Sequence, residues 1–160
     1  MKLGQLGWLA SCLLGGCHAS PTGVVGAPPG PAPALHVQGN RLVDSAGRVV
    51  RLRGVNRSGA EFACAQGWGF FDGPSDSASV AAIASWKTNA VRVPLNETCW
   101  LAINGVAPAY SGDNYHRAIS DFVARLNRAG LVVILDLHWT AAGTAIALGQ
   151  APMPNRDHTP

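Results

Sequence analysis

Three strand-like segments, each ending in polar residues, place the strongest constraint on what this chain can fold into. They are Arg51–Asn56, Ala90–Asn96 and Leu131–Trp139, and each begins about 40 residues after the one before it, with helix-like sequence between them. Strand, helix, strand, helix, strand at that spacing is the repeating unit of a parallel α/β fold. Polar residues at the carboxyl ends of such strands are where α/β barrels build their active sites, so the sequence predicts a candidate site there.

The segments around these strands predict a hairpin and two helices. Alternating stretches at 36–38 and 41–43 flank the turn pair Gly39-Asn40, and a second turn at 44–47 follows. We expect this hairpin to have a structural role at the amino-terminal end of a barrel. One helix should start at 74–77 with an apolar stripe, and the other should start near Ser111 or Asp113 and end at Gly130. For the first helix we expect Trp86 to pack at its end and Asn89 to stop it.

Composition excludes two classes of protein. An apolar fraction of 48% and a charged fraction of 13% exclude a disordered polymer. The net charge is only +3, and the Lys and Arg residues are scattered singly, without the basic stripe that nucleic acid needs. We therefore expect no nucleic-acid partner.

The first 35 residues predict export. Residues 1–17 have a Lys near the start and a short apolar stretch that is too short to cross a bilayer. They end in Leu-Gly-Gly-Cys, which resembles a bacterial lipobox in which Cys17 is lipidated. Cleavage near Ala19 without a lipid is the open alternative. Residues 18–35, rich in Pro, Gly and Ala, read as a flexible linker before a folded part at 36–160. We expect a protein that is lipid-anchored at the bacterial cell surface or secreted, with no other membrane contact.

Two cysteines remain in the folded part, Cys64 and Cys99. They follow the first and second strands, in loops that a parallel sheet places on the same face. In an oxidising compartment we expect them to form a disulfide, with two free buried thiols as the alternative. The cysteines lack the close spacing of ligand residues typical of zinc sites, so we expect no metal.

Several side chains at the strand ends are candidates for binding or chemistry. Arg92 lies inside an apolar strand and should pair with a carboxylate, either to orient a catalytic group or only to bridge strands. Asp136 and His138 share one face of the third strand by period-two alternation. His138 suits a ligand hydroxyl or a proton, and a structural histidine is the alternative. Trp139 suits a sugar face or the core.

Taken together, RGVN, VRVP and DLHW at this spacing resemble the first three strands of glycoside hydrolase family 5, the cellulase-like (β/α)8 barrels. The resemblance covers about residues 36–160. It implies a TIM barrel of which about the first three βα units are present, preceded by the hairpin. A different parallel α/β fold, such as an open nucleotide-binding sheet, is the other reading. Against it, Gly54 stands alone, without the spacing of a phosphate-binding loop.

The resemblance implies a retaining, cellulase-like endo-β-1,4-glucanase without a cofactor, acting on a β-linked polysaccharide or oligosaccharide and monomeric at full length. Two glutamates carry out the reaction in such enzymes, one as acid/base and one as nucleophile. In the family they end the fourth and seventh strands, and neither Glu61 nor Glu97 fits those places. Arg92 would support the nucleophile, and His138 would contact the sugar with Trp139. We therefore expect a chain truncated before both catalytic glutamates and inactive alone. A non-catalytic surface lipoprotein that binds glycans is the alternative.

Overall fold

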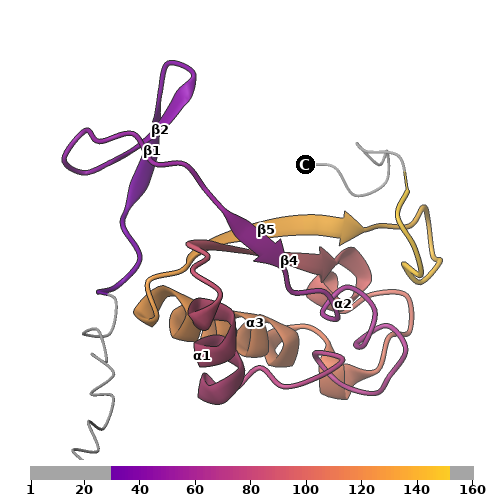
Figure 1. The fold of residues 1–160 in the computed structure, drawn as a ribbon. Helices are drawn as coiled ribbons and strands as arrows, with labels where there is room; N and C mark the ends of the chain where they lie inside the picture. Colours follow the sequence, from indigo (N-terminus) through magenta and orange to yellow (C-terminus); the bar gives the residue numbers. More distant parts are fainter. Residues whose placement is uncertain (1–29, 152–160) are drawn as a thin grey trace, which may run out of the picture.

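The computed structural model describes residues 30–151, and Figure 1 shows how the elements follow one another. The residues before and after this range, including Cys17 and the predicted targeting segment, lie outside the described residues. In chain order the elements are β1 (Leu35–Gln38), β2 (Arg41–Asp44), β3 (Gly54–Asn56), α1 (Ser77–Ser85), β4 (Ala90–Asn96), α2 (Glu97–Leu101), η1 (Pro108–Tyr110), α3 (Asp113–Arg128) and β5 (Val132–Trp139).

The predicted hairpin is present as β1 and β2, which pair antiparallel in a sheet of their own. Gly39 has a positive φ of 60° at the turn, a conformation that glycine adopts without steric cost. The next turn is closed by Asp44, whose carboxylate accepts the backbone N–H groups of Ala46 and Arg48, both at 2.9 Å. The hydrogen bond from the Arg48 backbone is the main cause that lowers the pKa of Asp44. The structural role of the hairpin at the amino-terminal end of a barrel stays a prediction.

The three predicted strands form one parallel sheet in the order β3-β4-β5. β4 has the predicted bounds, whereas β3 covers only Gly54–Asn56 and not Arg51–Asn56. Asn89 explains the difference, because its side chain forms hydrogen bonds with the backbone of residues that precede β3. Its Oδ1 accepts from Arg53 N at 2.7 Å, and its Nδ2 donates to Arg51 O at 2.9 Å.

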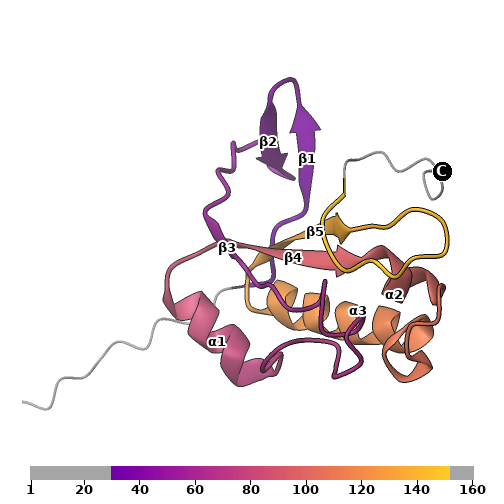
Figure 2. The ribbon, with the colours of Figure 1, turned by 90° about the vertical axis from the view of Figure 1, so that its right-hand side faces the viewer.

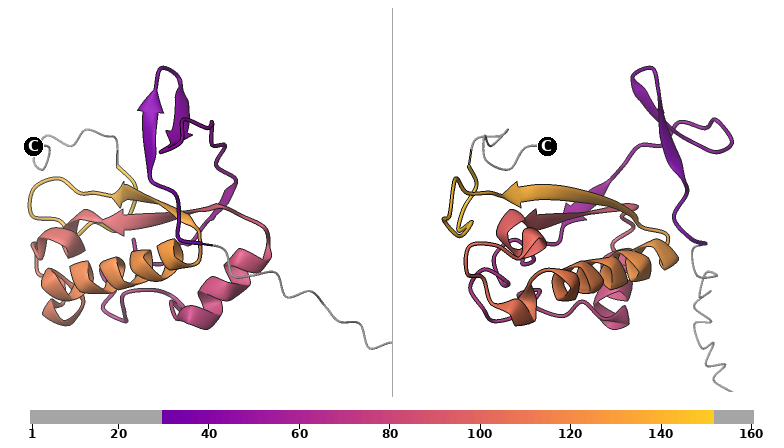
Figure 3. Two further views of the ribbon diagram at one scale, coloured as in Figure 1. Left: turned by 90° about the vertical axis from the view of Figure 1, so that its left-hand side faces the viewer. Right: turned by 180° about the vertical axis from the view of Figure 1, so that it is seen from behind.

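The helices cover one face of this sheet and leave the other face uncovered (Figures 2 and 3), with the hairpin standing on the uncovered side. On β4, the odd-numbered residues point to the helices: Val91 and Val93 are fully buried and Leu95 is 8% exposed. α3 meets them with an apolar stripe at helical spacing, made of Tyr115, Ile119, Phe122 and Leu126. Alternation then places the even-numbered residues of β4, Arg92 among them, on the uncovered face.

Three local expectations were wrong. α1 ends at Ser85 and not at Asn89, because Lys87 enters the left-handed region with φ 61°. Trp86 does not pack at the helix end but is 63% exposed. After β4, where a loop was expected, Glu97 opens the short helix α2. The side chain of Asn96 starts that helix by accepting from Cys99 N at 3.1 Å.

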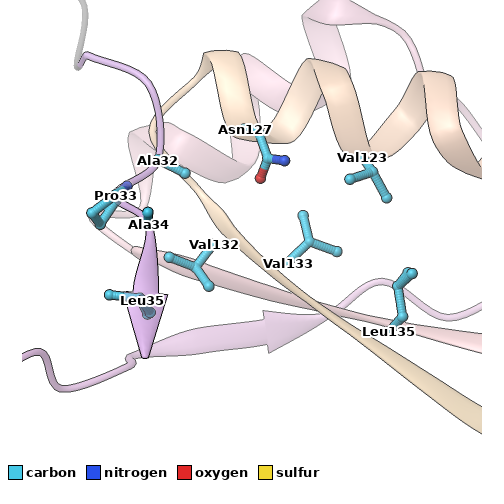
Figure 4. A pocket seen from close by; sticks show the side chains of 9 residues that line it. All are labelled: Ala32, Pro33, Ala34, Leu35, Val123, Asn127, Val132, Val133 and Leu135. Carbon is cyan, nitrogen blue, oxygen red and sulfur yellow. The ribbon is translucent and has the colours of Figure 1, made fainter. Parts of the chain in front are cut away.

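β5 is one of the two edge strands of the three-stranded sheet in the described part of the chain. A continuous apolar run is typical of a strand covered on both faces, yet Ile134, Leu135 and Leu137 of β5 are each more than 40% exposed. A pocket lies along this edge between residues 32–35, α3 and β5 (Figure 4). Ala32 donates its backbone N–H to Asn127 O at 2.7 Å, so this end of the predicted linker is tied to α3. None of the helices within residues 30–151 has the length and hydropathy to span a membrane.

Candidate functional site

A polar cluster of four side chains spans the three parallel strands on the uncovered face. It consists of Asn56 at the end of β3, Arg92 on β4, and Asp136 and His138 on β5. Arg92 is its centre: the guanidinium pairs with the Asp136 carboxylate, and it donates to Asn56 Oδ1 at 3.4 Å. The sequence singled out Arg92, Asp136 and His138, and the structure brings these three together.

The cluster remains open to solvent. The side chains of Arg92, Asp136 and His138 are 33%, 29% and 25% exposed, so Arg92 is half-buried although the strand around it is apolar. A ligand lying on the uncovered face can therefore reach all three side chains. Arg92 also bridges β3 and β5, so the strand-bridging reading and the functional reading describe the same geometry.

His138 is held at one ring nitrogen. Its Nδ1 lies 3.0 Å from Asp136 Oδ2 and 3.1 Å from Arg92 Nη2. Protonated on Nδ1, the ring donates to the carboxylate; protonated on Nε2, it accepts from the guanidinium. Within residues 30–151 no hydrogen bond occupies Nε2. This nitrogen can thus donate to or accept from a ligand hydroxyl, depending on the tautomer that Asp136 and Arg92 select.

A β-bulge directs the next side chain, Trp139, toward the same face. Leu95 pairs with Leu137, but Asn96 pairs with Trp139, so that His138 is the extra residue of β5. Bulges of this kind re-aim side chains next to sites. Because Asn96 lies on the same face of β4 as Arg92, Trp139 shares that face too. Its ring contacts Phe62 of the β3–α1 loop, with the centroids 6.1 Å apart.

A disulfide joins the loop after β3 to helix α2, beside the cluster. Cys64 and Cys99 are both fully buried and bonded, with their Cα atoms 6.2 Å apart, as their positions in the sequence predicted. Asn96, also fully buried, adds hydrogen bonds from its Nδ2 to Glu61 O at 2.7 Å and Ala147 O at 2.9 Å. The loops after β3, β4 and β5 are therefore fastened to one another at the carboxyl end of the sheet.

Both glutamates of the chain, Glu61 and Glu97, form hydrogen bonds within these connected loops. Glu61 is 6% exposed, and its Oε2 accepts from Gly59 N at 2.7 Å. Glu97 is 4% exposed, and its Oε2 accepts from Ala141 N at 3.2 Å. These contacts give both carboxylates a role in holding loop backbone. Among residues 30–151, no group of three or more His, Cys, Asp or Glu side chains is placed to hold a metal ion.

A shallow pocket of about 290 Å³ adjoins the cluster on the uncovered face. Asn56, Arg92 and Ile134 line it together with residues at the start of β3 and β4. Gly54 brings the two strands close there: a Cβ at this position would lie 2.3 Å from Ala90 O. The two backbones therefore approach each other closely at Gly54, where there is no room for a side chain. The pocket offers room beside Arg92 for a group bound on the cluster.

Sequence reasoning missed three members of this region: Asn56, Phe62 and Trp68. Asn56 had a signal, since it ends a predicted strand next to the others, but an amide at a strand end has many uses. Phe62 and Trp68 lie in a long loop whose path depends on the disulfide. A pattern of neighbouring residues in the sequence does not predict where such a loop places its side chains. Their rings are 5.9 Å apart.

Comparison with known proteins gives the same picture of the fold. The profile of the family "Cellulase (glycosyl hydrolase family 5)" matches residues 43–158. Among solved structures, a β-glucanase, SdGluc5_26A from Saccharophagus degradans in complex with cellotetraose, is 24% identical with a TM-score of 0.50; the match covers 68% of this chain and 29% of that one. An endogalactoceramidase is 27% identical with a TM-score of 0.54, covering 68% of this chain and 23% of the other. A cellulase, Cel5C_n, is 24% identical with a TM-score of 0.51, covering 75% and 35%.

No curated protein sequence matches the chain significantly. The chain spans between 23% and 35% of the length of the three solved proteins. Its three parallel strands, their helices and the preceding hairpin thus have the architecture of the first units of a (β/α)8 barrel. No closed barrel is formed within residues 30–151.

Proposed function

The chain belongs to the cellulase family, glycosyl hydrolase family 5, and from this premise we propose that the protein hydrolyses O-glycosyl bonds in β-linked polysaccharides, as a retaining, cellulase-like enzyme. The observation that carries the proposal is the cluster of Arg92, Asp136 and His138 on the uncovered sheet face. A similar solved β-glucanase is in complex with cellotetraose, which supports an oligosaccharide as the ligand.

In this proposal the residues of the chain bind and orient, and they do not break the bond. Arg92, anchored by Asp136 and Asn56, holds a catalytic carboxylate ionised and in place through its guanidinium. His138 Nε2 bonds a hydroxyl of the sugar at the bond to be cleaved. The two carboxylates, about 5–5.5 Å apart in a retaining enzyme, are glutamates of barrel strands that follow β5.

The test is an assay of the protein at its full natural length on a soluble β-1,4-glucan, following the release of reducing ends. We expect turnover, with the β-anomer as the first product seen by proton NMR, because two inversions at the anomeric carbon retain its configuration. The 160-residue chain alone should be inactive on the same substrate. Absence of turnover on every β-linked glycan tested with the full-length protein would reject the proposal, and turnover by the 160-residue chain would reject the assignment of the glutamates.

The second candidate is a surface protein that binds glycans without cleaving them. The specific observation in its favour is the set of aromatic rings beside the cluster, because rings of Trp and Phe bind sugars whether or not a reaction follows. Saturable binding of cellohexaose by the full-length protein, together with no hydrolysis over days, would favour this function over the first.

For either function we propose export with a lipid on Cys17. The support is the Leu-Gly-Gly-Cys sequence after a short apolar stretch. Labelling of cells with radioactive palmitate should mark the protein, and a Cys17→Ser variant should lose the label. A Cys17→Ser variant that keeps the label would place the lipid on another residue. An unlabelled parent that is found in the medium would favour secretion without a lipid.

A further inference from the structure

We propose that Trp68 is an outer sugar-binding platform, and that the rings of Trp139, Phe62 and Trp68 guide a linear β-1,4-glucan chain away from His138. This inference rests on the proposed function, whose site it extends toward longer substrates. It assigns a ligand to a loop residue that lies outside the polar cluster.

The three rings form a continuous row that begins at the cluster. Trp139 follows His138 directly in the chain, and its ring centroid lies 6.1 Å from that of Phe62. Phe62 lies 5.9 Å from Trp68, with the ring planes tilted by 37°. The row therefore leads from the position proposed for the cleaved bond to the outer end of the β3–α1 loop.

Trp68 has the exposure that a platform requires. The residue is 55% exposed, although burying an indole ring is strongly favourable and most Trp residues are largely buried. Its Nε1 donates to Gln66 Oε1 at 3.0 Å, which favours one orientation of the ring. An indole with much of its surface in water can accept a flat ligand.

The loop under Trp68 is held rigid by its attachment to the core. Trp68 N donates to Ala63 O at 3.2 Å, and Gly67 N donates to Cys64 O at 3.1 Å. Cys64 is bonded to Cys99 of α2 and fully buried. A ring on a pre-ordered loop binds at a lower entropic cost than a ring on a loose one.

Trp86 is also exposed but, in the described part of the chain, does not stand beside other aromatic rings, so exposure is not the only feature that distinguishes Trp68. Trp86 is 63% exposed at the end of α1. Among residues 30–151 it has no ring partner, whereas Trp68 stands in a row of three. Trp86 therefore serves as a matched control for the loss of an exposed indole.

The chemistry of the row favours glucan with β-1,4 linkages. Each glucose ring in such a chain carries its hydroxyls equatorially and presents flat C–H faces, and an indole face attracts C–H groups. Successive rings of the chain can then lie over successive aromatic side chains. Short oligosaccharides that fill only the positions near His138 would not reach Trp68.

The experiment compares Trp68→Ala, Trp68→Phe and Trp86→Ala in the full-length protein. Affinity is measured by calorimetry with cellotriose and cellohexaose, and kcat/KM with the same two sugars. We expect Trp68→Ala to weaken cellohexaose binding and kcat/KM about tenfold, with less than a twofold change on cellotriose. Trp68→Phe, which keeps a ring, should recover part of the loss, and Trp86→Ala should change neither sugar.

The outcomes separate this inference from the proposed function. An equal loss on both sugars, or no loss with Trp68→Ala, would overturn the platform while hydrolysis by the parent protein upholds the function. Hydrolysis of another β-glycan without binding of cellohexaose would do the same. Cellohexaose binding that Trp68→Ala weakens, in a parent protein that hydrolyses nothing, would uphold the platform and overturn the function. If Trp68→Ala fails to fold, the comparison of Trp68→Phe with the parent decides.

Discussion

The two faces of strand β4 differ in what they are made of and in what they contribute. On the face under the helices, Val91 and Val93 are fully buried among apolar side chains of α3 and its neighbours. On the other face, the side chain of Arg92 is 33% exposed and bonded to polar groups of β3 and β5. Buried apolar and partly exposed polar side chains alternate along β4, so this one strand contributes to both faces of the sheet.

The contrast indicates how stability and function are separated in this sheet. Apolar area removed from water stabilises the fold wherever it lies, whereas a half-exposed ion pair adds little net stability. The cluster of Arg92, Asp136 and His138 can therefore be arranged for a ligand at a small cost to the fold. The separation predicts that changes on one face move stability and changes on the other move activity.

The largest expected effect comes from the disulfide between Cys64 and Cys99, which both belong to the buried core. Replacing Cys64 and Cys99 by Ala together should lower the free energy of unfolding by about 4 kcal/mol, because the bond closes a loop of 35 residues in the unfolded chain. Urea unfolding of the full-length protein measures the change. The unreduced parent and the parent treated with reductant serve as references, and the reduced parent should match the double variant. A loss below about 1 kcal/mol would show that the loops do not depend on this bond.

The second effect tests the uncovered face. Arg92→Met should lower kcat/KM on a soluble β-1,4-glucan about 10- to 100-fold, because charge-assisted hydrogen bonds to the cluster are lost. The free energy of unfolding should change by less than about 1 kcal/mol, as for other partly exposed ion pairs. Arg48→Met, which removes the arginine of the hairpin pair with Asp44, is the control and should leave kcat/KM unchanged. A loss of stability with unchanged kcat/KM would make Arg92 a bridge between strands and nothing more.

The third effect tests the helix-covered face at Val93, the residue next to Arg92. Val93→Ala removes two buried carbon atoms from the helix-covered face and should cost about 2 kcal/mol in unfolding free energy. It should alter kcat/KM less than twofold, since the side chain points away from the cluster. Val37→Ala, at a position 72% exposed on the hairpin, is the matched control and should change neither quantity. A large drop in kcat/KM with Val93→Ala would break the separation of the faces.

Periodicity in the sequence predicted the covered face well. β4 has the predicted bounds, and α3 begins at one of the two predicted starts, because their apolar residues recur at the spacing of a strand and a helix over many positions. Shorter elements depend on single contacts and were missed. The five-residue helix α2 exists because Asn96 caps it, and β3 is short because Asn89, more than 30 residues away, takes the backbone of Arg51 and Arg53.

The uncovered face was predictable only in part. Arg92 and His138 stood out because a charged or polar residue within an apolar strand needs a partner, and the structure supplies that partner in Asp136. The ring contacts of Phe62 depend on the bulge at His138 and on the path of a long loop. Both features arise from tertiary structure, so the periodicity of apolar residues does not predict them.

The smallest expected effect concerns Asp76, which starts α1 on the covered face. Its carboxylate accepts the backbone N–H of Ser79 at 2.8 Å, and this hydrogen bond is the main cause that lowers the pKa of Asp76 below its ordinary value. A lower pKa in the folded state means that the ionised group stabilises the fold above its unfolded pKa, and that this contribution is lost as the pH falls through the folded pKa.

Asp76→Asn keeps an oxygen that can cap the helix but removes the titration. The parent should therefore be slightly more stable than Asp76→Asn at pH 7, and the difference should be smaller at pH 2, because the ionised form of Asp76 is lost as the pH falls through its folded-state pKa. Thermal unfolding of both proteins at the two pH values measures the difference in Tm. Because α1 lies on the covered face, kcat/KM at pH 7 should be the same for both. A Tm difference that grows on acidification would contradict the lowered pKa of Asp76. A change in kcat/KM would show that this end of α1 is coupled to the cluster across the sheet.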